Sequence, residues 1–169
     1  MPIEVREARP EERAEAGRVT ADAYREFVRD GDDGWQRYLD RIADVAERAD
    51  RTTVLIAVDG DRIVGSLTLE LEGRVRDDDD EEFRPLDAGE AHIRMLGVDP
   101  SARGRGVATS LMAEAERIAR AAGKTVITLH TTARMEAAKA MYERLGYDRT
   151  EDRVFPDGFV LLGYRRPLG

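Results

Sequence analysis

The sequence predicts an α/β fold, a single domain over residues 1–169 in which helices flank a central mixed β-sheet. Dense apolar runs such as Thr53–Val58 are typical of strands, and longer segments repeat apolar residues at helical spacing. Asp59-Gly60 between two strand-like runs is a strong hairpin signal. The predicted order, β-α-α-β-β-β-α-β-α-β-β, shows no internal repeat or linker, which indicates one domain.

The N-terminal part predicts one strand and two helices. Ile3 to Arg6 forms a short opening strand. Pro10 suits the first position of a helix, which apolar spacing extends to Phe27. A second apolar face predicts another helix, from Trp35 to about Ala49.

The middle of the chain predicts a hairpin, a loop and a further strand. The hairpin pairs Thr53–Val58 with Ile63–Leu69. The acidic run from Asp77 to Glu82 predicts a solvated loop, or alternatively a border of a site for cationic amines. Ile93 to Val98 is the next strand.

The C-terminal part alternates helices and strands. A helix from Val107 to Ala122 ends at Gly123 and is followed by a strand from Val126 to Thr131. A second helix, from Met135 to Leu145, ends at Gly146. The tail from Val154 to Arg166 predicts two short strands around a turn at Pro156-Asp157-Gly158.

Composition excludes several classes of function. The formal net charge of −8 argues against nucleic-acid binding and favours cationic small molecules as partners. The absence of cysteine excludes thiol catalysis and Cys-ligated metals, and the presence of only two histidines argues against a multi-histidine metal site. No apolar run reaches the roughly 18 residues of a membrane span, and the first residues lack a signal-peptide pattern, so we expect a cytoplasmic protein without membrane contact.

The alternation of inward- and outward-facing residues changes phase within the strand from His92 to Val98. Strict alternation from Ile93 would bury Met95 and Gly97, whereas Leu96 and Val98 are the better buried pair. This shift predicts a β-bulge near Met95 or Leu96, which would leave backbone donors available to a ligand. A strand buried on both faces explains the pattern equally well.

A glycine loop connects this strand to the following helix. Gly104 and Gly106 would let the main chain approach a phosphate at the helix start, and Arg103 and Arg105 add positive charge. A tight turn is the simpler alternative. A dinucleotide-binding fingerprint would need a third glycine and a later acidic residue, and a Walker loop would need Gly-Lys-Ser/Thr; the chain has neither pattern.

Two segments resemble the signatures of the GNAT acetyltransferase superfamily. Arg103, Gly106 and Ala108 match its pyrophosphate loop, [Q/R]-x-x-G-x-[G/A]. Ala138 to Tyr147 resembles its second signature, A-x-x-x-Y-x-x-x-G-[F/Y]. Met135 departs from the family, which often has Asn at this position.

The resemblance implies a GNAT fold whose sheet splays between two parallel strands, Ile93–Val98 and Val126–Thr131, with acetyl-CoA wedged between them. It implies that pantetheine pairs with the backbone at Leu96 and Val98, and that the diphosphate rests on the loop. A homodimer is common among similar proteins. The implied donor-binding residues are Leu96, Gly97, Val98, Arg103, Gly104, Arg105, Gly106, Val107, Ala108, Thr109 and Ser110.

The implied reaction is direct attack of a primary amine, on a small molecule or a protein, on the acetyl thioester. Tyr142 is the candidate acid for the departing thiolate, although its helical stripe is also consistent with simple packing. Glu90, His92 and Glu70 are candidate general bases, and each could instead be structural. A non-catalytic acetyl-CoA sensor is the alternative function.

Overall fold

The computed structural model describes residues 2–27, 39–76, 82–132, 135–154 and 160–169. Its main sheet has eight strands in the order β1-β2-β3-β6-β7-β10-β8, with β9 also pairing with β10. The strands are β1 (Ile3–Glu7), β2 (Thr53–Asp59), β3 (Arg62–Glu70), β6 (Glu90–Val98), β7 (Val126–Thr132), β8 (Asp148–Arg149), β9 (Arg153–Val154) and β10 (Val160–Pro167). β6 and β7 are parallel and the other pairs are antiparallel, which confirms the mixed sheet.

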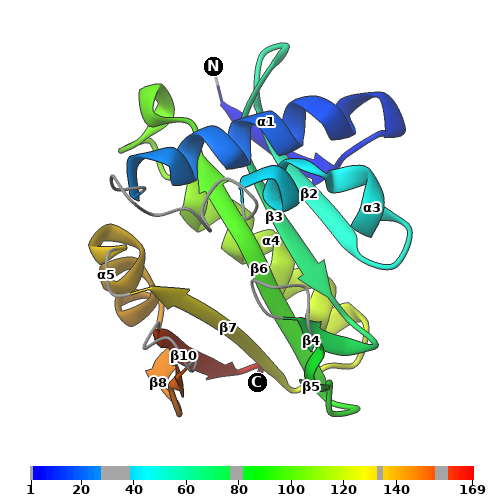
Figure 1. Ribbon diagram of the computed structural model, residues 1–169, viewed down its shortest axis with the longest axis vertical. Helices are drawn as coiled ribbons and strands as arrows, with labels where there is room; N and C mark the ends of the chain where they lie inside the picture. Colours follow the sequence, from blue (N-terminus) through cyan, green and yellow to red (C-terminus); the bar gives the residue numbers. More distant parts are fainter. Residues whose placement is uncertain (1, 28–38, 77–81, 133–134, 155–159) are drawn as a thin grey trace.

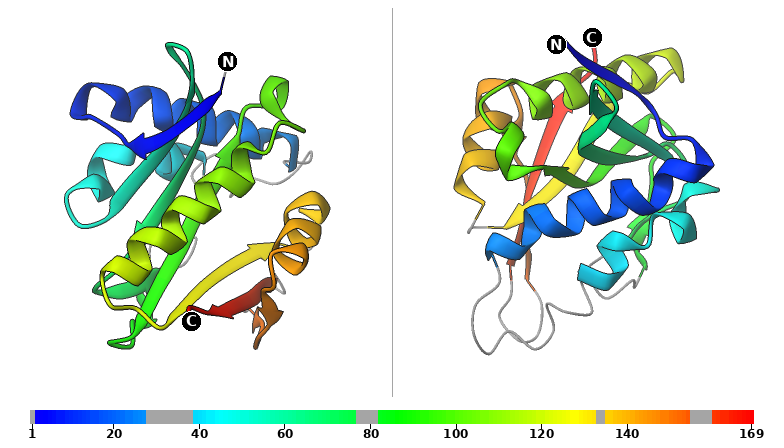
Figure 2. Two further views of the ribbon diagram at one scale, coloured as in Figure 1. Left: turned by 180° about the vertical axis from the view of Figure 1, so that it is seen from behind. Right: turned by 90° about the horizontal axis from the view of Figure 1, so that it is seen from above.

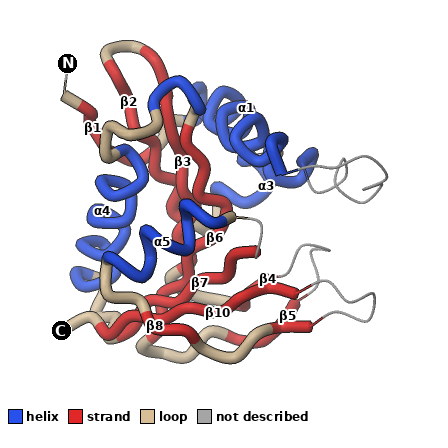
Figure 3. Tube along the Cα trace, turned by 90° about the vertical axis from the view of Figure 1, so that its left-hand side faces the viewer, coloured by secondary structure: helices blue, strands red, loops and turns tan. Residues whose placement is uncertain are grey.

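Helices cover both faces of the sheet. They are α1 (Arg13–Tyr24), a helical segment at 39–43, α3 (Val45–Ala49), α4 (Val107–Ala121) and α5 (Glu136–Arg144), with short 3-10 turns at Pro10–Glu12, Arg25–Phe27 and Pro100–Ala102. Figure 3 shows α1 and α3 on one side of the sheet and α4 on the other. Seen from behind, α4 lies across the strands, with α5 beside it (Figure 2). None of the helices in the described ranges has the length and apolarity that crossing a membrane would require.

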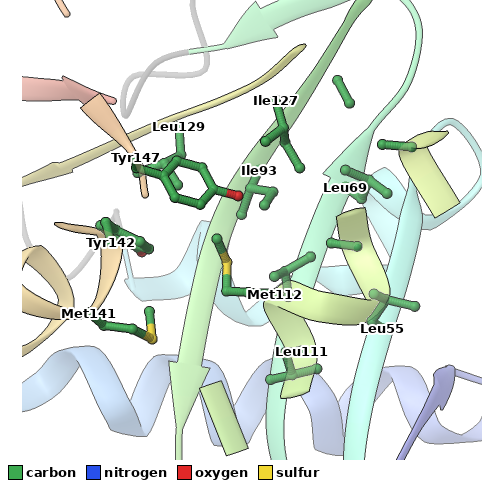
Figure 4. Close-up of a cluster of buried hydrophobic side chains, with 14 of the residues drawn as sticks. Leu55, Leu69, Ile93, Leu111, Met112, Ile127, Leu129, Met141, Tyr142 and Tyr147 are labelled. Carbon is green, nitrogen blue, oxygen red and sulfur yellow. The ribbon is translucent and has the colours of Figure 1, made fainter. Parts of the chain in front are cut away.

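The two faces of β3 and β6 have different chemistry. Leu67, Leu69 and Ile93 point into the main apolar core against α4, and Met112 and Tyr147 belong to the same cluster (Figure 4). The alternating residues on the other face are polar, and several of them are buried. They are Ser66, Thr68, Glu70, Glu90 and His92. This polar face carries the candidate bases.

β6 and β7 pair at one end only. Their register runs from Glu90 opposite Val126 to Ile93 opposite Leu129 and stops there. Beyond this point the two strands diverge, as Figure 1 shows, and the splay predicted between them is confirmed. The opening lies between the ends of α1, α4 and α5.

Some sequence predictions differ from the structure. The predicted helix up to Ala49 is interrupted at Asp44. There the Arg48 guanidinium donates hydrogen bonds of 2.8–3.1 Å to the carbonyls of Arg41, Ile42 and Asp44. These bonds satisfy the carbonyl end of the 39–43 segment, so the helix need not continue. A separate two-stranded sheet, β4 (Arg74–Arg76) with β5 (Glu82–Pro85), and the short β8 were not predicted.

The acidic run 77–82 is predicted to be a loop. Its one described residue, Glu82, is instead the first residue of β5, so the prediction is wrong at this position. The remaining acidic residues, 77–81, lie outside the described residues, as do Trp35 and the turn at 156–158. The other predicted strands and helices are confirmed, with ends that differ by a few residues.

Glu12 joins the first strand to the first helix. Its carboxylate accepts hydrogen bonds from the Arg6 guanidinium at 2.8 and 2.7 Å and from the Arg9 N–H at 2.8 Å. The Arg6 bond and then the Arg9 bond lower the pKa of Glu12 from 4.5 to about 2.

Glu12→Gln is therefore expected to lower stability at neutral pH and to reduce acid sensitivity. A depressed native pKa stabilises the fold above pH 4.5, and this contribution disappears as the pH falls toward 2. Urea unfolding between pH 7 and pH 3, beside Glu11→Gln as a charge-matched control, measures the difference. Equal pH slopes in Glu12→Gln and the unsubstituted protein would contradict the assignment.

Candidate functional site

A β-bulge interrupts β6 at the predicted place. Opposite β3, Ser66 pairs with Gly97 and Thr68 pairs with Arg94, so Met95 and Leu96 together face one residue. Met95 adopts φ +55°, the left-handed conformation that a bulge can require. The predicted bulge is confirmed, and it lies just beyond Ile93, the last residue of β6 that pairs with β7.

The residues after the bulge face the opening. Leu96 and Val98 are half-buried and line a cavity, so the expectation that they form a buried pair is wrong: the splay removes the neighbouring strand that would cover them. The Asp99 N–H donates to the Val64 carbonyl on β3 at 2.8 Å. Because N–H groups alternate in direction along a strand, the Val98 N–H points away from β3, toward the opening.

Gly97 lets α1 approach the strand. A Cβ at this position would lie 3.0 Å from Thr20 Cα and 3.2 Å from Ala23 Cβ. Any side chain would therefore push α1 outward, and the end of this helix forms one wall of the cavity. Gly97 also lines the cavity through its backbone.

The cavity has a volume of about 330 Å³ and connects the opening to the glycine loop. Its lining includes most of the predicted donor-binding residues: Leu96, Gly97, Val98, Arg103, Gly104, Gly106, Val107, Ala108 and Thr109. Tyr142 lines it from α5. Among the predicted residues, Arg105, Ser110, Glu90 and His92 do not line it.

The glycine loop leads directly into α4. Gly104 and Gly106 have φ of +78° and +76°, which glycine adopts without strain, and no atom of the described residues lies within 4 Å of a Cβ built on either one. Gly106 is the N-cap of α4. The first N–H groups of a helix have no intrahelical acceptor and carry the positive end of its dipole, so this end of the cavity suits an anion.

Both loop arginines contact carboxylates from distant segments. Arg103 forms a two-bonded pair with Glu26 in the 3-10 turn that follows α1, with distances of 2.8 and 2.6 Å. Arg105 contacts Asp59 at 2.7 Å. Glu26 and Arg103 both line the cavity, so this pair lies at its edge. The sequence alone did not point to Glu26, which is 77 residues away from Arg103.

Tyr142 lies among aromatic rings at the boundary of the cavity and the core. Its ring is 5.9 Å from that of Tyr147 and 5.6 Å from that of Tyr164, and the residue is buried. Burial, with smaller contributions from Tyr24 and Tyr164, raises the pKa of Tyr142. Its hydroxyl is therefore protonated throughout the physiological range and can donate a hydrogen bond.

Met135 contributes an apolar side chain to the cavity wall, at the position where the sequence analysis noted that Asn is common. It is the N-cap of α5, lines the cavity and packs against the apolar cluster that contains Tyr24 and Leu39. Thr131 donates a hydrogen bond to its sulfur at 3.4 Å. No side-chain hydrogen bond from Met135 caps the helix.

The candidate bases form a separate polar cluster, on the face of the sheet opposite α4. The Thr128 hydroxyl lies 2.5 Å from Glu90 Oε2 and 2.8 Å from His92 Nδ1, and so connects these two candidates. Glu70 accepts a hydrogen bond from Arg94 at 3.3 Å. Sequence analysis missed Thr128, although its place between the buried Ile127 and Leu129 marks a polar face of this strand.

Comparisons with known proteins agree with this geometry. Residues 19–147 match the Acetyltransferase (GNAT) family, and no curated protein matches the chain. Similar solved structures include a GCN5-related N-acetyltransferase from Rhodopseudomonas palustris, with 20% identity and TM-score 0.74 over 99% of this chain and 97% of that one. The PaiA N-acetyltransferase from Thermoplasma acidophilum, solved with coenzyme A, has 14% identity and TM-score 0.73 over 99% of each chain. YncA from Salmonella typhimurium, solved with acetyl-CoA, has 17% identity and TM-score 0.69 over 99% of this chain and 94% of that one.

Proposed function

Since this chain belongs to the GNAT acetyltransferase family, we propose that it transfers the acetyl group of acetyl-CoA to the nitrogen of a primary amine. The observation that carries the proposal is the continuous cavity from the bulged strand β6 to the start of α4. Such a cavity suits a long donor with an amide-rich arm and an anionic end. Tyr142 on its wall favours an enzyme over a binding-only sensor.

The donor would lie along β6 with its diphosphate at the glycine loop. Its pantetheine amides would pair with the backbone of Leu96 and Val98, in the place that β7 leaves open. The N–H groups from Arg103 to Ala108 would hold the diphosphate, with Thr109 on the cavity wall. Arg105 and Ser110 would act at the edge of this region, since neither lines the cavity.

The transfer needs three contributions from the chain. Holding donor and amine together makes the attack effectively intramolecular. A backbone N–H at Leu96 or Val98 would stabilise the oxyanion that develops on the thioester carbonyl. Tyr142 would donate a proton to the leaving thiolate, and Glu90, His92 or Glu70 would accept the proton of the amine.

Calorimetric titration with acetyl-CoA tests the donor site, and an acetylation assay over a panel of small amines and lysine peptides tests the reaction. We expect a dissociation constant in the micromolar range and turnover with at least one amine. Absence of acetyl-CoA binding would overturn the proposal. Binding without turnover over a broad panel would instead support the sensor.

Glu26→Gln is expected to strengthen acetyl-CoA binding by about 2- to 5-fold. This change in affinity corresponds to the free energy of one exposed ion pair. The Glu26 carboxylate holds the Arg103 guanidinium, and its charge would repel the phosphates of the donor at the cavity edge. The matched control is Glu15→Gln, which removes an equal charge from α1 at an exposed pair with Arg18. If affinity were unchanged, or changed equally in both variants, Glu26 would have no influence on the donor.

A further inference from the structure

Met135 lies near the end of the cavity that is farther from the glycine loop. β6 and β7 run parallel, and Ile93 with Leu129 is their last register pair. Three residues further along each strand, Thr132 lies at about the level of Leu96, where β6 first lines the cavity. The Met135 N–H donates to the Thr132 carbonyl at 3.1 Å, which keeps Met135 close to this level. The glycine loop lies beyond it, after the end of β6.

The side chains around this end of the cavity are apolar. Met135 packs against the cluster that contains Tyr24 and Leu39, and the bulge residue Met95 packs against the same cluster. Tyr24 and Met135 both line the cavity, so the cluster forms part of its wall. Ala138, one turn further along α5, adds a small side chain to this lining. A wall of this kind favours a hydrocarbon group of a ligand over a charged one.

Met135 is the member of this wall that can change its shape most easily. A methionine side chain has three rotatable bonds and adapts to irregular spaces. Met135 is half-buried, whereas Tyr24 and Leu39 are buried. Its sulfur, a weak acceptor, receives a hydrogen bond from Thr131 at 3.4 Å, and among the described contacts its side chain does not cap α5. A substitution here therefore reshapes the cavity wall and removes neither a helix cap nor a fully buried side chain.

We propose that Met135 determines which acyl chains the donor site accepts, because its side chain forms the wall that the acyl group meets. This inference rests on the proposed binding of acetyl-CoA. With its diphosphate at the glycine loop, the donor would run along Val98 and Leu96, and its sulfur would meet Tyr142. The acyl group then lies beyond the sulfur, at the end of the cavity that Met135 lines. An acetyl group stops short of Met135, and each further methylene of a straight chain comes closer to its side chain.

Calorimetric titration with CoA and with acetyl-, propionyl-, butyryl- and valeryl-CoA tests this inference without any acceptor. Each affinity is divided by that of CoA, which has no acyl group. Met135→Ala removes Cγ, Sδ and Cε, a length of about three chain carbons. We expect butyryl- and valeryl-CoA to bind more tightly to Met135→Ala than to the unsubstituted protein, by about 4-fold for each methylene that takes the place of the lost atoms. The affinity for CoA itself should not change.

Met135→Leu is the matched control for this experiment. Leucine keeps an apolar side chain of similar volume and, like alanine, cannot accept the hydrogen bond from Thr131. Met135→Leu should therefore keep the chain-length preference of the unsubstituted protein, for which we expect valeryl-CoA to bind more weakly than acetyl-CoA.

Three results would overturn the inference. They are an unchanged preference in Met135→Ala, the same gain in Met135→Leu, and tighter binding of valeryl-CoA than of acetyl-CoA by the unsubstituted protein. The last comparison needs no variant, so it decides even if Met135→Ala does not fold. Failure of CoA and acetyl-CoA to bind the unsubstituted protein would overturn the proposed function as well, and this outcome is distinct from binding with an unchanged chain-length preference.

Discussion

Tyr142→Phe is expected to lower kcat by about 100-fold or more, within the range that general acid catalysis contributes. The substitution removes one hydroxyl from a ring that packs against Tyr147 and Tyr164 and leaves the ring itself in place. Because burial raises the pKa of Tyr142, the hydroxyl stays neutral at the pH of any ordinary assay. Its loss would leave the thiolate without a proton donor at the cavity wall. KM for acetyl-CoA should change little.

Tyr147→Phe is the matched control for this prediction. Tyr147 contacts the Tyr142 ring, but its hydroxyl donates to the buried Glu116 at 2.9 Å, and Glu116 also accepts from Arg166 at 2.8 Å. Removing this hydroxyl should cost about 1.5–3 kcal/mol of unfolding free energy, as expected for a bond to a charged group, and leave kcat close to its original value. If both variants lost rate equally, packing of the rings rather than a proton donor would explain Tyr142.

The sequence predicts the backbone of the cavity better than the side-chain contacts around it. The parity shift at Met95 and the glycines before α4 are local patterns, and each corresponds to a local backbone feature: a bulge and a left-handed turn. Glu26 and Thr128 lack such a pattern. Glu26 contacts Arg103, and Thr128 contacts Glu90, only because separate elements pack together. The partners are 77 and 38 residues apart in the sequence. Periodicity within one segment cannot report contacts of this kind.

The same limit explains the errors in the predicted fold. The helix break at Asp44 depends on Arg48, whose guanidinium also reaches Thr68 on β3. Apolar spacing from Leu39 to Val45 continues across the break and so predicts one helix. The half-burial of Leu96 and Val98 depends on where β7 stops pairing, and the composition of β6 does not contain this information.

Packing of α1 against β6 helps to shape the cavity. Gly97 allows Thr20 and Ala23 to approach β6, and the end of α1 with the 3-10 turn that follows it brings Tyr24 and Glu26 to the cavity. Gly97, which the resemblance implies for donor binding, therefore also sets the distance between α1 and the sheet. A change at Gly97 would alter the cavity and the stability together, which makes it a poor probe of donor binding alone.

Gly106 is a cleaner probe, and Gly106→Trp is expected to weaken acetyl-CoA binding by at least about 100-fold. The indole would start in open space on the cavity wall and occupy the place of the diphosphate. Loss of two hydrogen bonds to a charged group, at about 1.5–3 kcal/mol each, corresponds to this change in affinity. The left-handed conformation of Gly106 adds a strain of about 1–2 kcal/mol to the folded protein.

Gly123→Trp separates the strain from the effect on the site. Gly123 follows the other end of α4 with φ +81°, close to the +76° of Gly106, and within the described part of the chain a Cβ there would also meet no atom within 4 Å. Both variants should lose a similar free energy of unfolding in urea, whereas calorimetry should find weakened acetyl-CoA binding in Gly106→Trp alone. Equal affinity in the two variants would place the diphosphate away from the start of α4, because only Gly106 lines the cavity.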